Sequence, residues 1–358
     1  MWGLGARVGK WCPASICRPF GGCGSGRVRL TPVAGHAHLR LIIIPAVPSM
    51  PPASDLIQHA IDRRSERRAD RAYLQDLHGA ADVKFLVIGG ARAAIVSSED
   101  RRRAAVRWFS AAELAALNIS TANALFLGVE AKSRTGRFAV VLGDSEADAH
   151  MEALAPLVDL RSLVMQGVIG QESFGQMAEA KMLSEWHASA KYCGRCGSET
   201  KIKDGSWKII CTACAVEQFP RVDPVVIMLV THGENCALAH EPRFPEKMYS
   251  TLAGFVEPGE DVRSAVRRET REEIGIEVGN VEFFGSQPWP FPNSLMIGCV
   301  AEVLDDTITI DQNEISHARW FGRSEVRDML SMKHAHGLFV PGGHAIAHAL
   351  IRQWAEVK

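Results

Sequence analysis

The sequence predicts an α+β protein with α-β-α layering, in which a mixed sheet between helices follows a small cysteine-rich ribbon and an N-terminal α/β domain. Three observations support this prediction. Beyond residue 221, strand-like and helix-like apolar patterns interleave without strict βαβ repetition, which favours a mixed sheet. Two Cys-x-x-Cys pairs lie in mid-chain, and a glutamate-rich helical pattern follows them. At 358 residues the chain is long enough for two or three domains.

The composition is that of an ordinary globular protein, with 47% apolar and 23% charged residues. A formal net charge of -1 provides no overall attraction to nucleic acids or anionic membranes. No apolar run approaches the roughly 18–20 residues that span a bilayer, so no membrane segment is predicted. The paired cysteines favour metal binding over disulfides, which is typical of a reducing compartment. We therefore expect a cytoplasmic protein.

Residues 1–50 are predicted to be a disordered leader or a start assigned too far upstream. The first 54 residues contain no Asp or Glu and six Lys or Arg, as an organelle transit peptide would. Scattered Pro and Gly would interrupt an amphipathic helix, however, which favours Met50 as the true start.

Residues 54–190 are predicted to form an N-terminal α/β domain. Strands are predicted at residues 83–90 and 137–143, and helices at residues 109–117 and 173–187. Ser110 stands in an N-cap position with Glu113 three residues later, which is the pattern of a capping box. No phosphate-binding loop, catalytic triad or metalloprotease motif occurs here, so this domain is expected to be a scaffold.

Residues 191–220 are predicted to form a zinc ribbon. Its four cysteines are Cys193, Cys196, Cys211 and Cys214. Two Cys-x-x-Cys pairs separated by fourteen residues can supply four thiolates to a tetrahedral zinc ion. Such a closed site has no open coordination position, so the zinc, one per subunit, would be structural. The alternatives are a redox pair, which needs only one Cys-x-x-Cys, and buried free cysteines.

Residues 221–358 contain the glutamate-rich helix, between a predicted strand at residues 225–230 and a closing helix at residues 343–357. Glu269, Glu272 and Glu273 are spaced i, i+3 and i+4, so they share one helix face. Clustered carboxylates repel one another unless a cation neutralises them, and an oxygen-only site suits Mg²⁺ or Mn²⁺. Taken alone, these glutamates would more commonly form a solvated acidic face.

The complete string from Gly254 to Ile276 resembles the signature of the Nudix hydrolases, G-x5-E-x7-R-E-U-x-E-E-x-G-U, where U is aliphatic. Its single departure is Thr270 in the first aliphatic position, where a β-branched side chain close to Val in shape is expected to preserve the catalytic role. The resemblance implies a Nudix fold and metal-assisted hydrolysis of a diphosphate, in which Glu272 or Glu273 accepts the proton of the attacking water.

A proline stretch (residues 286–294, SQPWPFPNS) follows the helix. Alternate prolines stiffen an extended backbone that cannot lie in the middle of a sheet, and they present Trp289 and Phe291 at little entropic cost. Stacking on a flat heterocycle and completion of the core are equally plausible roles. This stretch, the Nudix signature and the cysteine ribbon together resemble the NADH pyrophosphatase family, most clearly over residues 190–358.

The resemblance implies site residues position by position. The ligands of a catalytic Mg²⁺ or Mn²⁺ would be Ala253 through its main-chain carbonyl, Glu269, Glu272, Glu273 and Glu314. The substrate contacts would be Phe219, Phe255, Gln287, Pro288, Trp289, Pro290, Phe291, Pro292, Asn293, Ser294 and Ala347. Arg161 is a further, isolated match in the N-terminal domain, and Ser206 stands where some family members have an acidic substrate contact.

The resemblance also implies a homodimer that cleaves NAD(H) to NMN(H) and AMP and removes NAD caps from RNA 5′ ends. Two alternatives remain open. One is a Nudix hydrolase for ADP-ribose or another nucleoside diphosphate derivative. The other is a zinc-ribbon RNA-binding module whose Nudix-like domain senses NAD, although a sensor has no need of the complete set of glutamates.

Overall fold

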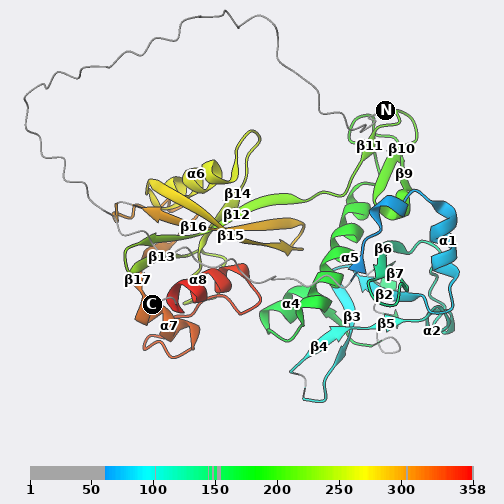
Figure 1. Cartoon of the computed structure of the whole chain (residues 1–358), viewed down its shortest axis with the longest axis horizontal. Coiled ribbons are helices and arrows are strands. Elements are labelled where there is room, and N and C mark those ends of the chain that lie inside the picture. Colours follow the sequence, from blue (N-terminus) through cyan, green and yellow to red (C-terminus); the bar gives the residue numbers. More distant parts are fainter. Residues whose placement is uncertain are drawn as a thin grey trace, which may run out of the picture. The chain divides into compact units, whose positions relative to one another are not determined.

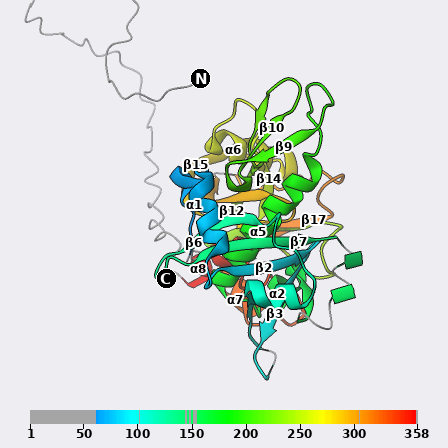
Figure 2. The ribbon, with the colours of Figure 1, turned by 90° about the vertical axis from the view of Figure 1, so that its right-hand side faces the viewer.

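The computed structural model describes residues 61–100, 102–143, 145–146, 149–150, 155–303 and 305–356 (Figure 1, Figure 2). The expectation for residues 1–50 lies outside the described residues. Within the described ranges, no helix has the length and apolar character that crossing a membrane requires.

The N-terminal domain contains an eight-stranded sheet in the described residues. Its strands are β1 (Ile61–Asp62), β2 (Lys84–Gly89), β3 (Arg92–Ser97), β4 (Ala104–Val106), β5 (Trp108–Phe109), β6 (Leu125–Glu130), β7 (Gly136–Leu142) and β8 (Leu157–Asp159). The main order is β1-β6-β7-β2-β3-β4, and β2 pairs in parallel with β7. The predicted strands at residues 83–90 and 137–143 are confirmed as β2 and β7.

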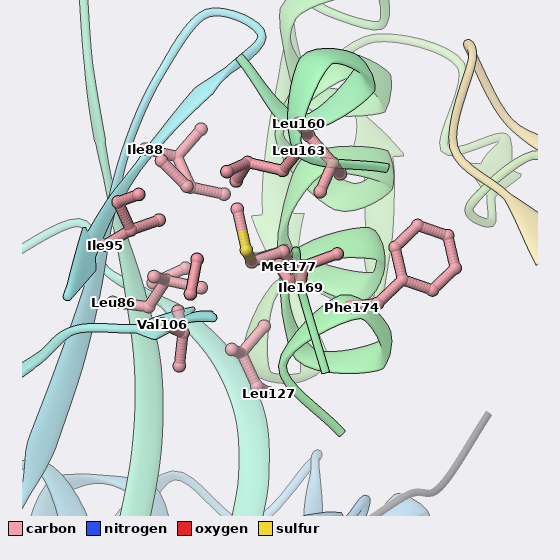
Figure 3. Packing of buried hydrophobic residues seen from close by; sticks show 14 of the residues in the cluster. Leu86, Ile88, Ile95, Val106, Leu127, Leu160, Leu163, Ile169, Phe174 and Met177 are labelled. Atoms are coloured by element: carbon pink, nitrogen blue, oxygen red, sulfur yellow. The ribbon is translucent and has the colours of Figure 1, made fainter. Parts of the chain in front are cut away.

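Helices cover this sheet on both faces. They are α1 (Arg71–Gly79), α2 (Ala111–Ala116), α4 (Leu160–Met165) and α5 (Gln171–Ser189). Strand β2 shows why both faces are covered: Leu86 and Ile88 belong to one buried cluster and Phe85 and Val87 to another. In Figure 3 the first cluster lies between the strands and the helices that carry Leu160, Leu163, Phe174 and Met177. Both helices predicted in this domain are confirmed, as α2 and α5.

The predicted capping box of α2 is present. The side chain of Ser110 accepts a hydrogen bond from the main-chain N–H of Glu113, whose carboxylate accepts one from the N–H of Ser110 at 2.8 Å. Two main-chain donors of the first turn are thereby satisfied, which is the local reason that a helix begins here.

The ribbon is a three-stranded sheet that follows α5. Its strands, in the order β11-β10-β9, are β9 (Thr200–Lys203), β10 (Lys208–Cys211) and β11 (Glu217–Gln218). A short 3₁₀ turn at Asp204–Ser206 connects β9 to β10.

The last part of the described chain forms a six-stranded mixed sheet. Its strands are β12 (Asp223–His232), β13 (Asn235–His240), β14 (Leu252–Phe255), β15 (Val278–Trp289), β16 (Ser294–Val303) and β17 (His317–Gly322). The main order is β15-β16-β12-β13-β17; β12 and β16 are parallel, and the other pairs are antiparallel. Strand β15, which ends in the proline stretch, is an edge strand, where prolines leave no ladder hydrogen bond unmade.

Helices pack on both faces of this second sheet, which confirms the predicted sheet between helices. They are α6 (Val262–Ile274), α7 (Arg323–Leu330) and α8 (Ile346–Glu356). Val226 and Met228 of β12 cluster with Ala265 and Val266 of α6. Ile227 and Leu229, on the opposite side of the same strand, cluster with residues of α7 and α8. The predicted strand at residues 225–230 lies within β12, and the closing helix begins at Ile346 rather than at residue 343.

Thr270, the departure from the Nudix pattern, lies fully buried in α6, and its hydroxyl has no hydrogen-bond partner among the described residues. We expect Thr270→Val to raise the free energy of unfolding by about 1 kcal/mol, because it replaces a desolvated hydroxyl with a methyl group of the same shape. Urea denaturation measures this change. A loss of stability of similar size would show that the hydroxyl is hydrogen-bonded.

Candidate functional site

Helix α6 presents the three predicted glutamates in different environments. The helix begins where Asp261 accepts a hydrogen bond from the main-chain N–H of Ser264 at 2.8 Å, and it ends at Gly275, whose φ is 73°. Glu269 and Glu273 are buried, whereas the side chain of Glu272 is 52% exposed. The shared helix face therefore runs from the protein interior to the surface.

Arg268 connects the glutamates to the loop before the helix. Its guanidinium donates two hydrogen bonds to Glu260, at 2.7 and 2.9 Å, in a bidentate pair. It also donates at 2.8 Å to each of Glu269, Glu272 and the main-chain carbonyl of Phe255. Because the planar fork is satisfied on all sides, it holds these groups in one arrangement.

The acidic loop residue Glu260 is held in its ionised form. The hydrogen bonds from Arg268 and from the main-chain N–H of Glu257 lower the pKa of Glu260 to about 2. Burial has the opposite effect on Glu269, whose pKa is raised despite the same guanidinium. Neighbouring carboxylates therefore differ in how readily they lose a proton.

Glu273 is the most deeply enclosed carboxylate of the set. Burial first, and then the charges of nearby carboxylates, raise its pKa to about 8. Those carboxylates are Glu269, Glu241 and Glu314. Its Oε2 has no hydrogen-bond partner among the described residues. A buried carboxylate oxygen without a donor, surrounded by other carboxylates, is a chemically suitable ligand for a hard divalent cation.

Two members of this acidic group come from outside the helix. The structure brings Glu314, which was predicted, close enough to influence the pKa values of Glu269 and Glu273. Glu241, just past β13, was not predicted, because nothing in its local sequence distinguishes it from a surface glutamate. Its charge contributes to the raised pKa of Glu273, so folding brings it near α6.

Gly254 of β14 is required by the position of Glu269. A Cβ atom at residue 254 would lie 1.8 Å from the carboxyl carbon of Glu269 and 2.0 Å from one of its oxygens. Main chain and carboxylate therefore approach each other as only glycine permits. Ala253 is the preceding residue of the same strand, and its main-chain carbonyl is the remaining predicted metal ligand.

We expect Gly254→Ala to weaken Mn²⁺ binding by about tenfold, because the new methyl group displaces the Glu269 carboxylate from its place beside Arg268. Calorimetric titration measures the binding. Gly279→Ala is the matched control, since a Cβ there meets only the carbonyl of Glu302 at 3.4 Å. Equal affinities in the two variants would contradict the requirement for glycine at residue 254.

The four cysteines of the ribbon converge on one point. Their sulfur atoms lie 3.4 Å (Cys196–Cys211), 3.5 Å (Cys196–Cys214) and 3.7 Å (Cys193–Cys214) apart. Four thiolates at about 2.3 Å from a zinc ion would be about 3.8 Å apart, whereas a disulfide would need about 2.05 Å. In the described part of the chain, no other group of three or more ligating side chains is equally close together. The cysteines therefore fit zinc.

The proline stretch leaves the sheet at its edge. Pro288 and Trp289 still pair with Leu295 and Ser294 of β16, and the following residues form the turn between the two strands. The rings of Trp289 and Phe291 meet edge to face, with centroids 5.1 Å apart. Both rings are half-buried and pack against the core cluster of the N-terminal domain. Of the two roles left open by the sequence, completion of a core is confirmed, and stacking on a heterocycle stays a prediction for the exposed part of each ring.

The other predicted substrate contacts divide into exposed and buried residues. Phe219 and Phe255 are more than half exposed, as stacking would require. Gln287 is buried, and both ends of its amide are occupied: it donates to the carbonyl of His344 at 2.6 Å and accepts from the N–H of Ile346 at 2.9 Å. Gln287 thereby anchors the start of α8, an arrangement that its position in the sequence did not reveal.

The remaining positions lie near that anchor or near the start of β12. Ser294 and Ala347 are buried, and Asn293 donates a hydrogen bond to Asp223 at 3.3 Å. Ser206 stands where some family members have an acidic residue. It is buried, and its carbonyl lies 2.7 Å from Nε2 of His187.

Comparisons with known proteins match two consecutive parts of the chain. The NUDIX domain family matches residues 220–342, and the family described as the NADH pyrophosphatase zinc ribbon domain matches residues 188–219. The NAD-capped RNA hydrolase NudC of Mycobacterium bovis is 39% identical over 241 residues, which cover 62% of this chain and 76% of that protein.

Two further relatives are shorter matches. The human NAD-capped RNA hydrolase NUDT12 is 44% identical over 198 residues, which cover 52% of this chain and 43% of that protein. The NAD-capped RNA hydrolase NudC of Pseudomonas aeruginosa is 43% identical over 162 residues, which cover 45% of this chain and 58% of that protein. The match thus spans less than half the length of the human relative.

Proposed function

This chain belongs to the NADH pyrophosphatase family of Nudix hydrolases, and on that premise we propose that it hydrolyses the pyrophosphate bond of NAD(H) to give NMN(H) and AMP. The observation that carries the proposal is the buried Glu273 carboxylate, which has an unpartnered oxygen and lies beside Glu269. Burying a carboxylate oxygen without a partner is costly, and a bound cation would offset that cost by binding the oxygen.

The residues that would hold Mg²⁺ or Mn²⁺ are Ala253 through its carbonyl, Glu269, Glu272, Glu273 and Glu314. Such a cation, when bound, neutralises the diphosphate and lowers the pKa of water. The protein supplies the arrangement: Arg268 orients Glu269 and Glu272, and Gly254 lets the main chain approach Glu269. Either Glu272 or Glu273 would accept the proton of the attacking water.

The dinucleotide would be held by the proline stretch together with exposed aromatics. Trp289 and Phe291 remain partly exposed, and Phe219 and Phe255 are the most exposed of the predicted aromatic contacts. The zinc ion in the ribbon would be structural, because four thiolates leave no open position. Gln287 and Ala347 would support this site from its buried side.

Removal of NAD caps from RNA is proposed as a second activity, because all three relatives described above carry that name. A homodimer whose sites combine residues of both subunits is proposed with it on the basis of the family resemblance. RNA bearing a 5′ NAD cap and free NADH should therefore be compared directly, and the molar mass of the protein in solution should be measured.

The test of the proposed function is an NADH cleavage assay with Mg²⁺ or Mn²⁺ and identification of the products. The expected products are NMNH and AMP in equal amounts, and chelation of the cation should abolish their release. Faster cleavage of ADP-ribose than of NADH would instead indicate a broader Nudix hydrolase. Binding of NAD without any release of AMP would indicate a sensor.

A further inference from the structure

A buried lysine of the N-terminal domain contacts the proline stretch. Lys181 of α5 is 4% exposed, and its ammonium donates a hydrogen bond to the main-chain carbonyl of Pro290 at 2.8 Å. The same ammonium pairs with Glu185, one helical turn further on. Burying a lysine is costly unless its charge is paired and its donors are satisfied, so this contact is a specific one.

The aromatic side chains of the proline stretch also contact the N-terminal domain near Lys181. The ring of Phe291 lies 5.5 Å from the Lys181 ammonium and 4.7 Å from the Arg161 guanidinium, measured to the ring centroid. Trp289 meets Phe291 edge to face, and both rings pack against a cluster of the N-terminal domain. Phe174 and Met177, shown in Figure 3, belong to that cluster. Cations at both distances interact favourably with an aromatic face.

Beyond the pairing with β16, the main chain of the proline stretch has few other hydrogen bonds. The N–H of Phe291 donates to the carbonyl of Trp289 at 2.8 Å, and the carbonyl of Asn293 accepts from the N–H of Asp223 at 2.9 Å. Pro288, Pro290 and Pro292 have no N–H group, so alternate residues cannot donate a hydrogen bond. The pairing of β15 with β16 ends at Trp289 and Ser294, immediately before Pro290. Pro290 is itself buried, and a buried carbonyl without a donor would be costly. Lys181 supplies that donor from a different domain.

We propose that Lys181 is a positioning residue, through which helix α5 fixes the turn that presents Trp289 and Phe291 to the substrate. The N-terminal domain then has a defined part in the reaction: it sets the geometry of the dinucleotide site and is more than a passive scaffold. This inference rests on the proposed function for its kinetic consequence, but the contact that it describes can be tested without any substrate.

The test compares Lys181→Met with Arg137→Met. Methionine keeps an unbranched apolar side chain while removing the donor and the charge. Arg137 is a matched control, because it is a largely buried cation of the same domain that contacts Glu130 and Trp108 instead of the proline stretch. We expect Lys181→Met to lower kcat/KM for NADH by about tenfold and Arg137→Met to change it by less than about twofold.

A double-mutant cycle separates positioning from general stability. If Lys181 acts through the aromatic pair, Lys181→Met should cost less than about twofold in a Trp289→Ala background. Penalties that multiply in the double variant would overturn the proposal. Should Lys181→Met fail to fold, Glu185→Gln weakens the same anchor from its more exposed end, with an expected loss of about threefold.

Hydrogen exchange provides the readout that needs no substrate. The five amides of this segment belong to Gln287, Trp289, Phe291, Asn293 and Ser294. They should exchange at least about fivefold faster in Lys181→Met than in the unmodified protein or in Arg137→Met. Unchanged exchange overturns the proposal, whatever the kinetics. If the unmodified protein releases no AMP from NADH, the proposed function fails, and the exchange experiment alone decides the role of Lys181.

Discussion

Glu273→Gln is expected to lose about a thousandfold in NADH cleavage, the largest effect of any single substitution in the site. Glutamine has the same shape as glutamate but carries no negative charge, so the unpartnered oxygen of residue 273 can no longer serve as an anionic ligand. Glu269 and Glu272 cannot move to compensate, because Arg268 holds both carboxylates.

The fold should survive this substitution. We expect the unfolding temperature in the absence of divalent cations to change by only a few degrees, because one uncharged isostere replaces a buried carboxyl whose neighbours repel its charge. The zinc content should remain one ion per chain. Glu277→Gln, just past the helix and 73% exposed, is the matched control and should keep full activity. Near-normal cleavage by Glu273→Gln would remove this glutamate from the mechanism.

Loss of the zinc ion is expected to unfold the ribbon. Apparent binding free energies of structural zinc sites are about 10 kcal/mol or more, so Cys211→Ser should lose the metal and most of the order of β9–β11. The ribbon has little to replace the ion. Its buried apolar residues are Cys193, Ile209 and Cys211. Strand β9 exposes charged side chains.

Zinc content by mass spectrometry and protection of the ribbon amides by hydrogen exchange measure this effect. Cys236→Ala is the matched control, because Cys236 is a buried cysteine of β13 outside the ribbon and its loss should leave one zinc per chain. A Cys211→Ser protein with a full complement of zinc and unchanged exchange would show that the four sulfurs do not form the site.

Local patterns were sufficient to predict several elements, among them α2, α5 and α6, and the common helix face of the glutamates on α6. Ser110 and Glu113 predicted a helix start, because the capping box involves only residues three apart. Glu269, Glu272 and Glu273 were predicted to share a face because helical spacing alone places them there. The proline stretch was predicted to avoid a sheet interior because proline cannot donate a hydrogen bond, and it lies at the end of an edge strand.

Contacts between distant segments could not be predicted in the same way. Glu241 lies more than thirty residues from Glu273 in the sequence, yet its charge raises the pKa of that carboxylate. The side-chain amide of Gln287 is hydrogen-bonded to main-chain groups almost sixty residues later. Lys181 lies in the predicted helix at residues 173–187, and its local sequence gives no sign of a partner outside that helix. Its contact with Pro290 spans 109 residues and depends on how two domains pack.

The sequence by itself determined the chemistry of this protein: a carboxylate helix suited to a divalent cation, a four-cysteine zinc ribbon and a stiff aromatic segment. It did so because the spacing of ligands along a helix or a knuckle is a local property of the chain. Only the tertiary structure decided which carboxylate is buried without a partner, which residues anchor the proline stretch, and that the N-terminal domain holds it. Burial and hydrogen-bond satisfaction depend on segments far apart in the chain, and they exist only once those segments have packed together.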